Sequence, residues 1–135
     1  MVILVEKGKT MYLLFIDDNQ DRHDLIERFL GKNHTIFHAF DAEEAFQIAQ
    51  TYPYPLVMFF DHDMPGKNGS ELASRMIDQL PEEKLPVKVI VHSNNFSGAE
   101  NIAAKFRSAG VNVKKIMFSA TVSFLTAVEE ELREN

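Results

Sequence analysis

The chain has 135 residues, 45% of them hydrophobic and 25% charged, with a net charge of -6 and no cysteine. This length suits one globular domain with a single core, and the lack of cysteine excludes disulfides, thiolate metal sites and a thiol nucleophile. The acidic balance argues against a broad nucleic-acid-binding face, which needs surplus lysine and arginine, although it leaves a nucleotide open as a small substrate.

The apolar residues 2–5 are too few for a signal-peptide core or a membrane span, so we expect a cytoplasmic protein without membrane contact. We assign residues 1–10 to an N-terminal extension, with 2–5 as a candidate edge strand, and residues 11–135 to one domain. Within that domain short apolar runs alternate with amphipathic segments. Strands are expected at 11–16, 35–40, 56–60, 87–91 and 111–118, and helices at 21–30, 42–51, 70–80, 98–108 and 121–133. Such βα units build a parallel sheet covered by helices on both faces.

Polar side chains follow three of these strands at the point where each strand ends. The apolar run 56–60 has the pattern of a central strand buried on both faces, and it leads directly into an acidic residue. Because ligands bind beyond the carboxyl ends of parallel strands, we expect these residues to share one crevice. They are Asp17, Asp18, Asp61, Asp63, His92, Ser93 and Asn95.

Carboxylates held this close repel one another, and a divalent cation is the usual compensation. Oxygen ligands from Asp17, Asp18 and Asp61, completed by a backbone carbonyl and waters, suit Mg²⁺ or Mn²⁺. Such a cation also neutralises phosphate oxygens, and Ser93 and Asn95 would add donors to a bound phosphate near a helix start. The sequence therefore predicts a pocket for a metal and a phosphate-bearing small molecule or phosphodonor.

These motifs resemble the response-regulator receiver family over residues 11–133. The resemblance rests on Asp17-Asp18, on Asp61 followed by Met64-Pro65 and Gly69, on Ser93 and on the segment 39–45. It implies a flavodoxin-like (βα)5 three-layer sandwich with a five-stranded parallel sheet. It also implies that Asp61 is the phosphoacceptor, that Asp17, Asp18 and Asp63 are metal contacts (the last through its backbone), and that Ser93 senses the phosphate.

The chain departs from the receiver pattern in the fifth strand. Receivers carry a lysine at the end of that strand, where this chain has Met117-Phe118, and Lys114 and Lys115 come two or three residues too early. Lys114 also stands at the aromatic position used in receiver signalling. We therefore interpret the two lysines as a solvated strand start.

The stretches Asp61-His62-Asp63 and His92-Ser93-Asn94-Asn95, the latter followed by Gly98 and Asn101, look like the cyclic-phosphate-processing receiver domains. That family is proposed to act on cyclic phosphate linkages of nucleotides or RNA ends. Histidine suits this task because it serves as general acid or base near neutral pH. One of His62 and His92 would activate water while the other protonates the leaving hydroxyl.

Three hypotheses follow. The first is a metal-dependent enzyme acting on cyclic phosphates, with Asp61, His62, His92 and Ser93 as catalytic residues and Ser93 and Asn95 as phosphate contacts. The second is an atypical response regulator phosphorylated on Asp61, with a histidine kinase or another protein as partner. The third is a degenerate receiver that only binds partners. The sequence identifies no partners for His23, His34 and His38, which we expect to be surface or half-buried residues. We expect Glu129-Glu130-Glu131 to form the exposed face of the last helix.

Overall fold

The computed structural model describes residues 10–134 and contains the expected alternation of strands and helices. The strands are β1 Tyr12–Ile16, β2 Thr35–Ala39, β3 Val57–Phe60, β4 Lys88–Val91 and β5 Asn112–Lys115. The helices are α2 Gln20–Leu30, α3 Ala42–Thr51, α4 Gly69–Gln79, α5 Phe96–Ser108 and α6 Val122–Arg133, with a 3-10 turn at Glu82–Lys84. The candidate edge strand at residues 2–5 lies outside the described residues. No helix in the described range is long and apolar enough to cross a membrane.

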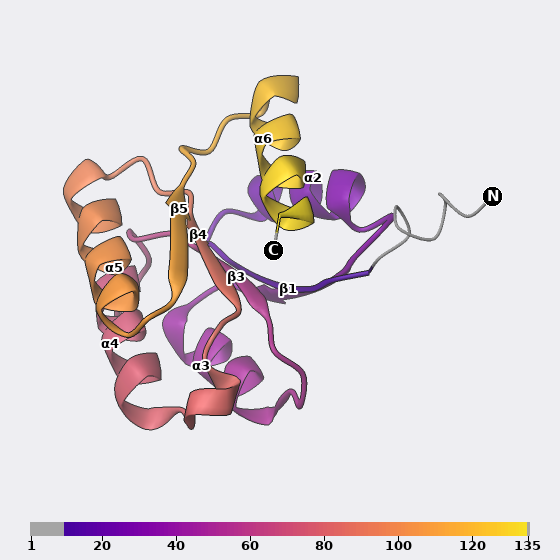
Figure 1. The fold of residues 1–135 in the computed structure, drawn as a ribbon. Helices are drawn as coiled ribbons and strands as arrows, with labels where there is room; N and C mark the ends of the chain where they lie inside the picture. The colour runs from indigo at the N-terminus through magenta and orange to yellow at the C-terminus, as the bar shows by residue number, and fades with distance from the viewer. Residues whose placement is uncertain (1–9, 135) are drawn as a thin grey trace.

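All five strands run parallel in one sheet of order β2-β1-β3-β4-β5. The strand order reverses between β1 and β3, and at such a switch point the carboxyl edge of a parallel sheet opens into a crevice. Helices α2 and α6 cover one face, while α3, α4 and α5 cover the other (Figure 1). The predicted flavodoxin-like (βα)5 three-layer sandwich is confirmed.

Alternate residues of the central strands pack into two separate helical layers. In β1, Leu14 and Ile16 belong to the core cluster under α3, α4 and α5, whereas Leu13 and Phe15 belong to the cluster under α2 and α6. Each of these side chains is fully buried, which is worth about 1.5–3 kcal/mol for a residue of this size. A strand that helices cover on both faces therefore needs an uninterrupted apolar run, which is the pattern that predicted these strands.

Polar caps at the sheet edge set where two helices begin. Asp41 accepts a hydrogen bond from the backbone of Glu44 and starts α3, as the sequence indicated. Asn95 accepts from the Gly98 backbone and starts α5 at Phe96, two residues before the expected start. Asparagine satisfies the free N–H groups of a first turn, so the loop after β4 is shorter than predicted.

Strand β5 ends at Lys115, three residues before its expected end. The chain beyond it stays beside β4, because the backbone N–H groups of Ile116 and Phe118 donate to Val91 and His92. The last strand lies at the sheet edge with Val113 buried and its other residues exposed, while its extension still reaches the carboxyl ends of the central strands.

Candidate functional site

Three of the predicted site residues meet at the carboxyl edge of the sheet. Asp17 follows β1, Asp61 follows β3 and His92 follows β4, and all three are buried. The N–H of Asp61 donates to the β1 carbonyl of Ile16 at 3.1 Å, and that of His92 to the β3 carbonyl of Phe60 at 3.0 Å. One ligand atom from each side chain lies within 4.8 Å of the other two. The three strand ends thus converge, while the roles of the side chains remain predictions.

Asp17 is held by donors from three directions. Its Oδ2 lies 2.9 Å from His92 Nε2 and 3.1 Å from Arg22 Nη1, and its Oδ1 accepts from the Asn19 backbone at 2.8 Å. Burial raises the pKa of the Asp17 carboxyl, but the hydrogen bond and charge of His92, together with the hydrogen bonds from Asn19 and Arg22, outweigh it, so this pKa lies below its ordinary value. Asp17 is therefore fixed as an ionised carboxylate.

Asp61 has the opposite electrostatic setting. Burial raises its pKa above the ordinary value, and the negative charge of Asp17 raises it further. Its Oδ1 accepts one hydrogen bond, from the His62 backbone at 2.9 Å. Ionisation of the buried Asp61 is therefore disfavoured beside the ionised Asp17. A cation placed next to these two carboxyls would be stabilised.

His92 faces the carboxylates, whereas Ser93 makes no hydrogen bond to them within the described residues. The His92 ring is fully buried and stacks on Phe15 at 4.8 Å between centroids, and its Nδ1 has no hydrogen-bond partner among the described residues. The Ser93 hydroxyl instead accepts the backbone N–H of Asn95 at 3.0 Å. The side chain at the end of β4 that touches the acidic cluster is therefore imidazole, one residue before the hydroxyl expected there.

A second cluster surrounds His62. Its Nδ1 lies 3.0 Å from Asp63 Oδ1, and Asn95 Nδ2 donates to both oxygens of Asp63 at 3.1 and 3.3 Å. The His62 ring packs on Gly98, where a Cβ would overlap it. The Asp61-His62-Asp63 and His92-to-Gly98 stretches thus form one contact region. Asp18, the remaining predicted metal ligand, is exposed next to Asp17.

Two histidines that the sequence left without partners form a chain of hydrogen bonds. His23 is buried, its Nε2 lies 2.7 Å from the Asp17 carbonyl oxygen, and its Nδ1 lies 2.7 Å from His38 Nδ1. His38 Nε2 in turn lies 2.7 Å from Glu27 Oε1. The carbonyl can only accept, so His23 donates through Nε2 and accepts at Nδ1 from His38. Burial lowers the pKa of His23, in keeping with this neutral form.

His23 is buried, so the expectation of a surface or half-buried residue was wrong for it, whereas His34 and His38 are half-buried as expected. All three have partners that the sequence did not reveal. His34 Nδ1 accepts the Met11 backbone N–H at 3.2 Å, and its Nε2 lies 3.7 Å from Glu129. The sequence could not indicate these pairs, because the paired residues lie up to 95 positions apart in the chain. Only the fold brings them together.

The lysines of β5 point to partners away from the acidic edge. Lys115 pairs with Glu100, and Lys114 lies 3.9 Å from Glu131. Phe118 occupies the end of the strand extension, with its ring centroid 6.1 Å from that of His92. Arg22, in the first turn of α2, is the basic residue that pairs with a carboxylate of the cluster within the described part of the chain.

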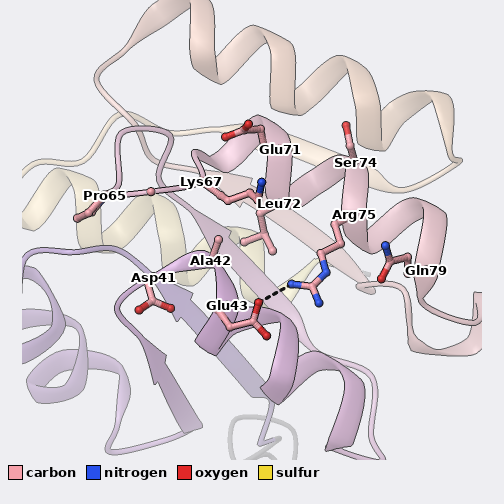
Figure 2. Close-up of a pocket in the computed structure, with 11 residues that line it drawn as sticks. Asp41, Ala42, Glu43, Pro65, Lys67, Glu71, Leu72, Ser74, Arg75 and Gln79 are labelled. Carbon is pink, nitrogen blue, oxygen red and sulfur yellow. Dashed lines mark hydrogen bonds and ion pairs between the residues drawn. The ribbon is translucent and has the colours of Figure 1, made fainter.

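Hollows of different size lie on the two sides of the sheet within residues 10–134. The larger, of about 760 Å³, lies between α3 and α4 and contains none of the predicted site residues; Arg75 crosses it to pair with Glu43 at 2.7 Å (Figure 2). The smaller, of about 440 Å³, lies between α2 and the chain after β5, and Arg22 and Phe118 line it. The smaller hollow therefore adjoins the acidic edge.

The fold is that of receiver domains in solved structures. The chain resembles the TrrA response regulator of Thermotoga maritima, crystallised with Mg²⁺-BeF, at 18% identity and a TM-score of 0.69 over 90% of this chain and 98% of that one. It also resembles a receiver domain of Methylobacillus flagellatus at 16% identity and a TM-score of 0.71, over 92% and 99% of the two chains.

The family is narrower than this class. Residues 12–108 match the family model of the cyclic-phosphate processing receiver domain, and the chain belongs to that family. No curated protein matches it. The predicted resemblance to receivers, and within them to this family, is confirmed.

Proposed function

We propose that this domain carries out metal-assisted processing of cyclic phosphate linkages in nucleotides or RNA ends. The observation that carries the proposal is the pairing of a buried carboxylate and imidazole cluster with a second histidine, His62, at its rim. The His62 side chain is 15% exposed, and Asp63 engages its Nδ1. Asp63 accepts a hydrogen bond from Nδ1–H, which leaves Nε2 as the nitrogen that would serve as the base.

The donor set suits a divalent cation. Asp17 and Asp61 supply carboxylate oxygens, and His92 has a nitrogen close by. The pKa of Asp61 is raised by burial and then by the negative charge of Asp17, and a cation would offset both effects. Exposed Asp18 would add an outer contact, and Asp63, whose carboxylate is engaged by His62, would contribute its backbone carbonyl. Carboxylates favour Mg²⁺ or Mn²⁺, and the Mg²⁺-BeF complex of TrrA supports the same choice. When bound, the ion would neutralise charge on the phosphate oxygens.

The chain's own side chains would divide the remaining work. His62 Nε2 takes a proton from a water as its oxygen bonds to phosphorus, and one ester P–O bond of the cyclic phosphate breaks. The proton then passes to the leaving ribose oxygen, so a cyclic diester and water yield a monoester. His92 holds Asp17 in place from its buried position, and Ser93 and Asn95 shape the loop beside the phosphate.

Incubation with Mn²⁺ or Mg²⁺ and a 2′,3′-cyclic nucleotide, read by product chromatography, tests the proposal. His62→Ala should lower turnover about 100-fold or more, the usual contribution of a general acid or base, with metal affinity unchanged. His92→Ala should weaken both metal binding and turnover. His34→Ala is the matched control, since His34 contacts Met11 and Glu129 at a distance from the site, and it should retain activity. Full turnover by His62→Ala would contradict the proposal.

A second candidate function, phosphorylation of Asp61 by a kinase or small phosphodonor, is favoured by the position of this carboxyl at the end of β3 in a receiver fold. Incubation with acetyl phosphate and Mg²⁺, read by intact mass, tests it. A gain of one phosphoryl group that is absent in Asp61→Asn, without nucleotide turnover, would favour the signalling role over the enzyme.

A further inference from the structure

Arg22 has no role in the motifs that suggested the function, yet it is the guanidinium at the acidic cluster. Its Nη1 lies 3.1 Å from Asp17 Oδ2, and its Cζ lies 5.0 Å from the centroid of the Phe118 ring. The contact with Phe118 restrains a long side chain through a cation–π interaction. Arg22 is therefore held at the point where the end of β1 meets the extension of β5.

The two lysines of β5 have partners elsewhere. Lys115 pairs with Glu100, and Lys114 lies near Glu131 at the opposite side of β5. Phe118, at the strand-five end where receivers place a lysine, supplies a ring on which the guanidinium rests. A phosphate entering between Asp17 and Asp61 would bring further negative charge to a site that already holds two carboxyls, so it needs a cationic protein partner besides the metal.

Arg22 is also accessible to a ligand. Its side chain is 28% exposed, and it lines the hollow of about 440 Å³ between α2 and the chain after β5. A guanidinium has five N–H donors in a planar fork, and the bond to Asp17 uses one of them. The remaining donors can bind phosphate oxygens while the first stays on Asp17.

We propose that Arg22 is the phosphate-binding cation of this site, supplied by α2 in place of a lysine from the fifth strand. A ligand would reach it from the adjoining hollow, which leaves room for the organic group bonded to the phosphorus. This inference rests on the proposed function and adds to it the residue that contacts the phosphate.

The inference predicts the direction in which Arg22→Gln changes the affinity for phosphate and the affinity for the metal. Titration calorimetry would measure the Kd of Mn²⁺ or Mg²⁺ alone, and then the Kd of inorganic phosphate at saturating metal, for wild type, Arg22→Gln, Arg22→Lys and Arg28→Gln. Arg22→Gln should weaken phosphate binding about tenfold or more, since it removes a charge-assisted hydrogen bond. It should leave metal affinity equal or stronger, because a positive charge beside the carboxylates is lost. Arg22→Lys should recover part of the phosphate affinity.

Arg28→Gln is the matched control, since Arg28 lines the same hollow from the same helix and is not paired with the carboxylates. It should change neither Kd. Equal phosphate affinity in wild type and Arg22→Gln, or a parallel loss of metal and phosphate binding, would overturn the inference. Failure of the proposed function has a different signature: wild type would bind metal and phosphate without turning over a 2′,3′-cyclic nucleotide, while phosphate affinity lost in Arg22→Gln would still support the role of Arg22.

Discussion

Gly98 lies in the first turn of α5, where the ring of His62 packs against its Cα. A Cβ at this position would overlap the ring atoms of His62. Gly69 is under a similar restriction, because a Cβ there would overlap the carbonyl oxygen of Asp61. Both glycines therefore hold the chain after β3 close to the helices that follow, and the reason is close approach, since neither has a positive φ.

Gly98→Ala should destabilise the protein by about 1–3 kcal/mol, the usual cost of overpacking a tight contact. In a His62→Ala background the same change should be neutral or stabilising by up to about 1 kcal/mol, because alanine favours a helix over glycine once the ring is gone. Urea unfolding of the four proteins in this double-mutant cycle measures the difference. An equal effect of Gly98→Ala in both backgrounds would show that the His62 contact does not limit this position.

At the scale of elements, α6 is attached to the sheet by a buried ion pair. Lys88 Nζ of β4 donates to the Glu131 backbone carbonyl at 2.7 Å and to Glu131 Oε1 at 3.0 Å, with the two side chains 7% and 11% exposed. The expectation that Glu131 lies on the exposed face of the last helix was wrong. This face of α6 also buries Phe124, Val128 and Leu132 against the sheet.

Glu131→Leu should destabilise the fold by about 3 kcal/mol, because it leaves the buried ammonium of Lys88 with only a carbonyl partner. Adding Lys88→Met to this variant should restore much of the loss, since the uncompensated charge is removed with it. Lys114→Met is the matched control: Lys114 lies 3.9 Å from the same glutamate but is 54% exposed, so its loss should cost under about 1 kcal/mol. Equal losses for Glu131→Leu and Lys114→Met, measured by urea unfolding, would contradict this account.

At the scale of the whole molecule, the buried carboxyls of the acidic edge form the candidate binding site but lower the free energy of unfolding. The pKa of Asp61 is raised in the folded state, so Asp61 favours folding while it is protonated and loses that contribution as pH rises through its folded pKa. At pH 7 the carboxyl is ionised in the unfolded chain, and the folded state carries the full cost of burial beside Asp17.

Asp61→Asn should therefore raise the free energy of unfolding at pH 7 in the absence of divalent ions, and the gain should shrink as the pH falls towards the ordinary aspartate range. Mn²⁺ or Mg²⁺ should raise the Tm of wild type more than that of Asp61→Asn, because a ligand of the native state stabilises it more when it binds more tightly. Thermal unfolding with and without the ion measures both effects. A wild type that gains no stability from the ion, or an Asp61→Asn variant that is less stable at pH 7, would refute this prediction.

Much of the architecture could be predicted from local patterns. The runs that became β1, β3 and β4 are apolar because both faces of those strands are buried, and Asp41 starts α3 through a bond to a residue three positions on. The alternation of elements then limits the topology to a parallel sheet with right-handed crossovers. The strand ends bearing Asp17, Asp61 and His92 had to share one edge, and the structure places them together.

The finer contacts depended on distances across the sheet. The sequence could indicate that Asp17, Asp61 and His92 share an edge, because parallel strands align their carboxyl ends whatever their side chains. It could not indicate that imidazole rather than the Ser93 hydroxyl meets Asp17, that Arg22 reaches the same oxygen, or that His23 and His38 bond to each other. Those pairings join side chains from separate elements, and packing in three dimensions alone decides which of them meet.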